Sequence, residues 1–240
     1  MPYEHTYQPS IWGKQVKRLA ILQSNYLPWK GYFRIIRESD LFIFYDDVKF
    51  TKNDWRNRNE IFINYKKTWL SIPVDSKAKK LINEVSLPNS DWKEQHLRKL
   101  YEGYQFSTNF SKVFNFVEAV YFSRDFHLLS DLNKTLIKEI YKEWLAIETP
   151  FEDSTDYPLS LKKGERVLEL CLQCHADVYI SDPAAKTYLN TSSFVKKGIK
   201  IDWMDYSNFK KYKQGSKEFV DHISIVDLLF SVGKDAAKYL

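Results

Sequence analysis

Residues 18–58 read RLAILQSNYLPWKGYFRIIRESDLFIFYDDVKFTKNDWRNR, and this stretch decides the fold. It begins with the apolar run 19–22, continues through a polar and aromatic loop over 23–29, and then shows apolar residues at helical spacing over 33–36. A second apolar run over 41–45 follows and ends at two carboxylates. Strand, loop, helix and strand in this order predict the first βαβ unit of an α/β domain.

The loop before the helix has a defined shape. Pro28 excludes Leu27 from the right-handed helical region, and Gly31 has no Cβ to obstruct a ligand or a second chain segment. The helix N-terminus that follows favours an anion through its N–H groups and dipole. The loop matches neither GxGxxG nor GxxxxGK[ST]. It is closer to the phosphate-contacting loop of nucleotidyltransferases, with Trp29 and Tyr32 in place of their histidines, although an aromatic turn that only packs is the alternative.

The rest of the chain extends the α/β pattern. Residues 60–64 and 68–74 predict a β-hairpin, 81–87 predict a further short strand, and helical periodicity then extends over about 90–147. The later predicted elements are a helix over 165–174, strands over 177–181 and 199–203, and a closing helix that begins at Ser224 with Asp227 in a capping box. We therefore expect an N-terminal arm over 1–16 and, over 17–240, a single Rossmann-like α/β domain with a mostly parallel sheet, a β-hairpin and a helical insert.

Composition narrows the class of ligand. The chain has 36 Lys and Arg and 31 Asp and Glu, a net charge of +5 that fits a small anionic ligand and is too diffuse for a nucleic-acid surface. Aromatic residues make up 16% of the chain, and Tyr and Trp suit sugars and bases. No apolar run approaches the ~18 residues of a membrane span, and the N-terminus lacks a signal-peptide pattern. We expect a soluble cytoplasmic protein without membrane insertion.

The cysteines and histidines do not predict a metal or haem centre. CLQCH over 171–175 resembles a haem attachment site only superficially, because such sites belong to exported proteins. Helical spacing places Cys171 and Cys174 on an apolar helix face, which predicts that both are core residues. The histidines show no paired ligand spacing, so no metal ligand is predicted.

Two polar clusters follow strand ends. Asp46 and Asp47 end the second predicted strand, and a cationic loop comes after them. Neighbouring strand residues point to opposite faces, so only one of the two carboxylates is expected to enter a given pocket. That carboxylate is a candidate general base, or a ligand for one metal ion, and the loop cations are candidates for phosphate contact. A solvated cationic loop is the alternative.

The second cluster follows the strand over 177–181. Its members are Ser181, Asp182, Lys186 and Tyr188, joined later in the chain by Tyr212 and Gln214. Ligands of doubly wound sheets bind beyond the carboxyl ends of the strands, so the two clusters are expected to line one cleft. An ordinary helix start at Asp182 is the alternative.

Several segments together carry a family resemblance. ILQSNYLPWKGYF, YDDVKFTKNDWRNRN, WLSIPV, ADVYISDPAAKTYL, YKQ and HISIVDLLFSVG resemble the WbqC-like proteins, from about residue 18 to the end of the chain. Asp182 stands where the family pattern has a Gly. Members of that family belong to bacterial O-antigen and related polysaccharide gene clusters, and some are proposed glycine transferases. The predicted site residues are Asp46, Asp47 and Lys52 for catalysis, and Gln23, Asn25, Tyr26, Trp29, Gly31, Trp55, Arg56, Asn57, Arg58, Ser181, Asp182, Lys186, Tyr188, Tyr212 and Gln214 for substrate binding, with no metal ligand.

The resemblance implies a transferase of O-antigen or other surface-polysaccharide biosynthesis. It would transfer an aminoacyl group, glycyl being one candidate, to the amine of a nucleotide-linked amino sugar, with amide formation. The cofactor stays open between ATP and an aminoacyl donor, with aminoacyl-tRNA as one such partner, and the oligomeric state stays open too. In this hypothesis Tyr26 and Trp29 stack on a sugar or base, Arg56 and Arg58 hold phosphate, and Gln214 orients a polar group. The alternatives are a nucleotidyltransferase-like enzyme that cleaves an α–β phosphate bond and a non-catalytic binding protein of the pathway.

Overall fold

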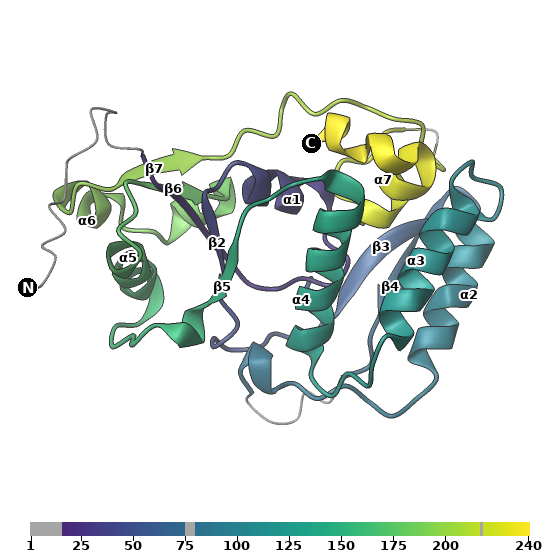
Figure 1. Cartoon of the computed structure of the whole chain (residues 1–240), viewed down its shortest axis with the longest axis horizontal. Coiled ribbons are helices and arrows are strands. Elements are labelled where there is room, and N and C mark those ends of the chain that lie inside the picture. Colours follow the sequence, from purple (N-terminus) through teal and green to yellow (C-terminus); the bar gives the residue numbers. More distant parts are fainter. Residues whose placement is uncertain (1–15, 75–79, 217) are drawn as a thin grey trace, which may run out of the picture.

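The predicted α/β fold class is confirmed. A computed structural model describes residues 16–74, 80–216 and 218–240, so the predicted arm lies outside the described residues except for Val16. The chain forms a five-stranded parallel sheet in the order β5-β2-β1-β6-β7 and a separate two-stranded antiparallel hairpin, β3-β4 (Figure 1). This arrangement is Rossmann-like.

The elements have the following bounds. The parallel sheet contains β1 (Arg18–Leu22), β2 (Leu41–Phe44), β5 (Phe151–Asp153), β6 (Val178–Ser181) and β7 (Lys200–Trp203), and the hairpin contains β3 (Arg58–Ile63) and β4 (Lys66–Ser71). The α-helices are α1 (Lys30–Arg37), α2 (Trp92–Tyr104), α3 (Phe110–Phe122), α4 (Leu129–Ile140), α5 (Lys163–Gln173), α6 (Thr191–Lys196) and α7 (Ile225–Val232). Single 3₁₀ turns occupy Ile82–Glu84, Ser154–Asp156, Pro183–Thr187 and Gly233–Tyr239, and a π-helical turn spans Tyr141–Leu145.

One predicted strand is absent and one strand was not predicted. The stretch 81–87 is a 3₁₀ turn flanked by isolated bridges at Leu81 and Ser86, because its neighbours offer it one pairing each instead of a ladder. Strand β5 was missed because it has only three residues and lies at the sheet edge, where a short run carries no readable alternation. The hairpin was predicted, and its turn is the pair Asn64 and Tyr65, with φ of 49° and 63°.

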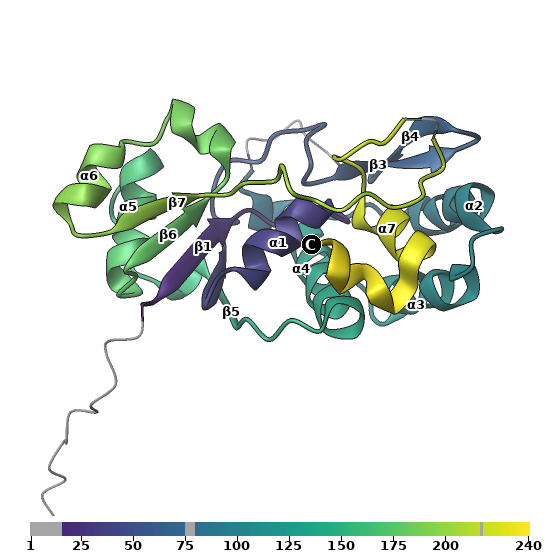
Figure 2. The ribbon, with the colours of Figure 1, turned by 90° about the horizontal axis from the view of Figure 1, so that it is seen from above.

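The sheet is buried on both faces, which explains the continuous apolar runs of its inner strands. Successive strand residues alternate between two cores. Leu19 and Ile21 pack with α5 and α6, whereas Ala20, on the other face, joins the larger core of α1, α4 and α7. Figure 2 shows α5 and α6 beside β6 and β7, with α1 near the middle of the molecule and α7 farther toward the hairpin. Cys171 and Cys174 are buried in the α5 core, as predicted.

The strand order fixes where a ligand can bind. Strand β2 pairs with one side of β1, and β5 pairs with the far edge of β2. The chain then returns, and β6 pairs with the other side of β1. The direction of the connections therefore reverses between β1 and β6. In doubly wound sheets the ligand crevice lies at this switch point, outside the carboxyl ends of the strands.

A long connection between β7 and α7 covers part of this end of the molecule. It crosses the sheet region toward the hairpin (Figure 2). Lys30, which is 2% exposed, anchors it: the ammonium donates a hydrogen bond to the Lys210 carbonyl oxygen at 3.0 Å and lies 4.5 Å from the centroid of the Phe209 ring. Burial lowers the pKa of Lys30 to about 8. The connection brings Tyr206 and His222 to the site.

Candidate functional site

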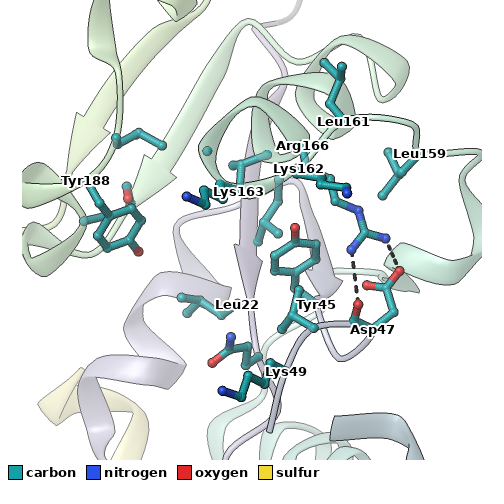
Figure 3. Close-up of a pocket in the computed structure, with 18 of the residues that line it drawn as sticks. Leu22, Tyr45, Asp47, Lys49, Leu159, Leu161, Lys162, Lys163, Arg166 and Tyr188 are labelled. Atoms are coloured by element: carbon teal, nitrogen blue, oxygen red, sulfur yellow. Dashed lines mark hydrogen bonds and ion pairs between the residues drawn. The ribbon is translucent and has the colours of Figure 1, made fainter. Parts of the chain in front are cut away.

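A large cleft opens at the carboxyl ends of β1, β2 and β6. It has a volume of about 1090 Å³ and is walled by the strand ends, by the segment before α5 and by the first turn of α5 (Figure 3). Gln23 from β1, Asp47 from β2, and Ser181 and Asp182 from β6 all line it. Members of both strand-end clusters singled out in the sequence thus meet at one cleft.

The cleft is rich in cations. Its charged lining residues are Lys49, Arg56, Lys162, Lys163 and Arg166 against Asp47 and Asp182. The first turn of α5 also lies at its wall, and the N-terminal N–H groups of a helix favour negative charge. An excess of cations in a concave site raises the local concentration of an anionic ligand. The cleft is therefore suited to a phosphate-bearing molecule.

Asp47 is the carboxylate of the acidic pair that reaches the cleft. It forms an ion pair with the Arg166 guanidinium, which also donates to the Asp47 backbone carbonyl at 3.2 Å. The Ser154 hydroxyl donates to Asp47 Oδ1 at 2.5 Å. The Arg166 guanidinium also lies 5.3 Å from the Tyr45 ring centroid. Figure 3 shows Arg166 reaching from α5 across to Asp47. These contacts fix the position of the Asp47 carboxylate just beyond the end of β2.

Asp46 faces the other way and does not line the cleft. It is 2% exposed, and its Oδ1 accepts a hydrogen bond from the Ser24 backbone N–H at 2.8 Å. The Lys134 ammonium lies 3.8 Å from Asp46 Oδ2. Burial raises the pKa of Asp46 despite these partners. Its contacts support the β1–α1 loop from behind, so a direct catalytic role does not fit its position.

A smaller cavity adjoins the large cleft. It has a volume of about 350 Å³ and shares Leu22, Arg56 and Asp182 with the cleft. Its remaining lining is mostly aromatic and amide: Asn25, Pro28, Trp29, Tyr32, Ile35, Trp55, Asn59, Ala184, Tyr206 and His222. The two cavities together form a bipartite site with a cationic half and an aromatic half.

The β1–α1 loop is held in a conformation that the chain does not adopt on its own. Leu27 has a φ of 42°, in the left-handed region. Its carbonyl oxygen accepts hydrogen bonds from the Asn59 amide at 2.7 Å and from the Ser224 hydroxyl at 2.8 Å. Such backbone strain persists only where surrounding contacts fix it. The loop thus presents Trp29 as a rigid wall of the small cavity.

Position 31 requires a glycine because the Trp29 side chain occupies the space that a Cβ would need. A Cβ at position 31 would lie 2.2 Å from Cζ2 of the Trp29 indole, which packs against Tyr206 at 4.8 Å and His222 at 4.2 Å between ring centroids. The close contact predicted for Gly31 is therefore with a neighbouring side chain of its own loop.

Gly31→Ala is expected to displace Trp29 and lower the free energy of unfolding by about 1–3 kcal/mol, even though Ala is the better helix former. Thermal unfolding and tryptophan emission measure both effects. Gly164→Ala, in the first turn of α5, is the matched control, because a Cβ there meets its nearest neighbour, Leu189, at 3.7 Å. Equal stability of the two variants would contradict the assigned role of Gly31.

Several predicted contact residues lie outside both cavities. Tyr26 is fully buried, and its hydroxyl bonds the His96 Nδ1 at 2.8 Å and the Tyr121 hydroxyl, so stacking on a ligand is not open to it. Asn57 is buried too and donates to the Ile72 carbonyl at 3.0 Å. The Arg58 guanidinium lies 4.0 Å from the Trp69 ring centroid. Lys52 and Lys186 are exposed and line neither cavity.

Tyr212 and Gln214, both half-buried, form a separate cluster around the buried Asp227. The Tyr212 and Tyr104 hydroxyls each donate to the Asp227 carboxylate at 2.9 Å, and the Gln214 amide donates to the Tyr212 hydroxyl at 3.1 Å. Gln214 lines a third cavity of about 270 Å³ that shares no residue with the other two. Asp227 therefore accepts hydrogen bonds within this cluster. It does not form the predicted capping box, because the Ser224 backbone N–H donates to the Glu60 carbonyl and not to the Asp227 carboxylate.

The cations at the start of α5 line the cleft but were not predicted from the sequence as site residues. Lys162 and Lys163 stand at the start of this helix, and Arg166 follows within its first turn. Cations at a helix N-terminus oppose the helix dipole, so their presence there is locally unfavourable. This local conflict was the available signal of a ligand site. The half-buried Tyr206 and the exposed His222 carried no such signal, because only the path of the β7–α7 connection brings them to the small cavity.

The fold and the bipartite cleft define a doubly wound α/β protein with a cation-lined cleft at its switch point. Comparison with known proteins gives the family: the model of the WbqC-like protein family matches residues 23–239, and the chain belongs to that family. It is 38% identical over 227 residues to the uncharacterized protein Rv1507c of Mycobacterium tuberculosis, covering 94% of this chain and 98% of that protein. No solved structure matches.

The described residues contain neither a candidate membrane span nor a candidate metal cluster. Across 16–74, 80–216 and 218–240, no helix has both the length and the apolar character needed to cross a membrane. Within the same ranges no group of three or more His, Cys, Asp or Glu side chains is arranged to hold a metal ion.

Proposed function

We propose that this protein is a transferase that forms an amide between an aminoacyl group, glycyl being one candidate, and the amine of a nucleotide-linked amino sugar. Membership of the WbqC-like family suggests a role related to polysaccharide biosynthesis. The observation that carries the proposal is the large cleft at the β1–β6 switch point, with five Lys and Arg side chains against two carboxylates. A nucleoside diphosphate sugar supplies the negative charge that such a cleft attracts.

The cleft residues divide into three roles. Arg56 is placed at the junction of the two cavities and binds the diphosphate, because a guanidinium suits bidentate contact with phosphate. Lys163 and Lys49 supply further positive charge along the cleft. Tyr188, which is 70% exposed at the cleft, offers a ring face to the sugar.

Asp47 is the proposed general base. The sugar amine arrives as an ammonium and must lose a proton before its nitrogen can attack the acyl carbon. Asp47 accepts that proton, and the amine nitrogen forms the new C–N bond. The bond between the acyl carbon and the donor oxygen then breaks, and the AMP or tRNA leaving group departs with the second proton of the nitrogen on its oxygen. The ion pair with Arg166 fixes the Asp47 carboxylate just beyond the end of β2. Asp46 is excluded from this role in the proposal because it is buried away from the cleft.

The test uses the full chain with UDP-amino sugars, glycine and either ATP or glycyl-tRNA, with products followed by mass spectrometry. The proposal expects a product heavier than the sugar nucleotide by one aminoacyl residue. Sugar-nucleotide binding without product from any donor would contradict it and favour a binding protein of the pathway. Release of pyrophosphate from a nucleoside triphosphate without acyl transfer would instead select the nucleotidyltransferase-like alternative.

A further inference from the structure

The small cavity is lined by an amide whose oxygen has no hydrogen-bond partner among the described residues. Asn25 lines it, and the Asn25 Oδ1 atom is shielded from solvent without a hydrogen bond to any described residue. Shielded polar atoms are almost always paired in folded proteins, so this oxygen is suited to a ligand donor. A carboxamide presents a donor and an acceptor side by side, the pattern with which Asn reads the edge of a nucleobase.

The walls of the cavity favour a flat ligand. Trp29 and Tyr206 meet edge to face at 4.8 Å between ring centroids, and Trp55 contributes a third ring that is 41% exposed. Trp55 contacts Trp69 at 5.9 Å on the hairpin. Aromatic side chains bind bases by stacking, whichever the base. An aromatic cavity beside a cationic cleft separates the two chemically different halves of a nucleotide.

The junction matches the part of a nucleotide between base and phosphate. Asp182 lines both cavities, and its carboxylate is fixed by the Ala184 N–H at 2.8 Å and the Tyr206 hydroxyl at 2.9 Å. A carboxylate at a strand end of a doubly wound fold binds ribose hydroxyls in this way. Arg56, on the same junction, is paired with Asp54 at 2.8 Å and presents its remaining donors for phosphate.

We propose that the small cavity is the nucleobase subsite of this protein. The base stacks between the aromatic side chains with its edge on Asn25, the ribose contacts Asp182, and the diphosphate passes Arg56 into the large cleft. The sugar then lies in the cleft near Tyr188 and Asp47. This orientation rests on the proposed function for the identity of the ligand as a nucleotide-linked sugar, but the subsite itself is tested by binding alone.

The test is calorimetric titration of the full chain with UDP, ADP and inorganic pyrophosphate. At least one of the two nucleotides is expected to bind about 10-fold or more tightly than pyrophosphate, which carries the phosphates without a base. Asn25→Ala and Trp55→Ala are each expected to weaken that nucleotide by about 10-fold and to leave pyrophosphate within about 2-fold. Tyr65→Ala, in the hairpin turn and 77% exposed, is the matched aromatic control and should change neither ligand.

Each other outcome is decisive. The subsite is overturned if pyrophosphate binds as tightly as both nucleotides. It is also overturned if Trp55→Ala weakens pyrophosphate binding as much as nucleotide binding. So does glycinamide binding that Trp55→Ala abolishes while nucleotide binding persists overturn it, because the small cavity would then hold the acyl group. A failure of the transfer assay with the base dependence intact overturns only the proposed function, whereas loss of the base dependence in a protein that catalyses transfer overturns only the subsite.

Discussion

Asp47→Asn is expected to lower the rate of amide formation by about 10²–10⁴-fold, the usual contribution of a positioned general base. The asparagine keeps an oxygen for the Ser154 hydroxyl, which lies 2.5 Å from Asp47 Oδ1, but it cannot accept the proton of the ammonium. It also releases Arg166 from its ion pair and removes one negative charge from a cationic cleft. Affinity for the sugar nucleotide should therefore hold or increase while turnover falls.

The split between turnover and affinity distinguishes catalysis from structural damage. Single-turnover rates and calorimetric titration with the sugar nucleotide measure the two quantities separately. Asp202→Asn is the matched control, because Asp202 forms an ion pair with Arg18 at 2.9 Å outside the cleft. Turnover of Asp47→Asn within about 5-fold of the parent chain would remove Asp47 from the chemistry.

Asp227→Ala is expected to lower the free energy of unfolding by about 2–3 kcal/mol, because the hydroxyls of the buried Tyr104 and the half-buried Tyr212 lose their acceptor. Tyr212→Phe, which removes a single hydrogen bond to Asp227, should cost about 1 kcal/mol. Denaturant unfolding followed by circular dichroism measures both variants. A cost for Asp227→Ala no larger than that of Tyr212→Phe would show that the cluster does not hold α7 in place.

The same carboxylate predicts a pH dependence with a definite sign. Burial raises the pKa of Asp227 to about 6, above the usual value of an unfolded Asp. Between about pH 4 and pH 6 the folded state therefore holds more protons than the unfolded state, and stability falls as the pH rises through this window. Asp227→Asn does not titrate, so its stability relative to the parent chain should rise from about pH 4 to about pH 6 and stay level above it. A level difference throughout would contradict the buried carboxylate.

Most of the fold could be predicted from local patterns in the sequence. The runs that form β1, α1 and β2 alternate or repeat with the periods of strand and helix, and the polar residues after the strands lie where a doubly wound sheet binds ligands. Asp47 and Asp182 could be placed at one cleft on this basis alone. β5 could not, since three edge residues carry too little pattern.

The errors at the site come from contacts between distant parts of the chain. Tyr26 lies in a polar loop and has the composition of a ligand contact, yet His96 and Tyr121, 70 and 95 residues away, enclose it. Tyr212 was expected at the cleft, but Asp227 draws its hydroxyl into another cluster. Arg166 was overlooked because its partner Asp47 lies 119 residues away. Side-chain pairing over such separations has no local signature.

Both native cysteines are buried, so a cysteine introduced at the cleft could be labelled selectively with a spectroscopic probe. Cys171 is 0% and Cys174 3% exposed, and burial raises the pKa of both thiols, so the reactive thiolate is scarce at neutral pH. The chain has no other cysteine. A cysteine introduced by Tyr188→Cys at the cleft would therefore be the single thiol to react rapidly with a maleimide dye. A fluorophore attached there would report ligand occupancy without any change to the native thiols.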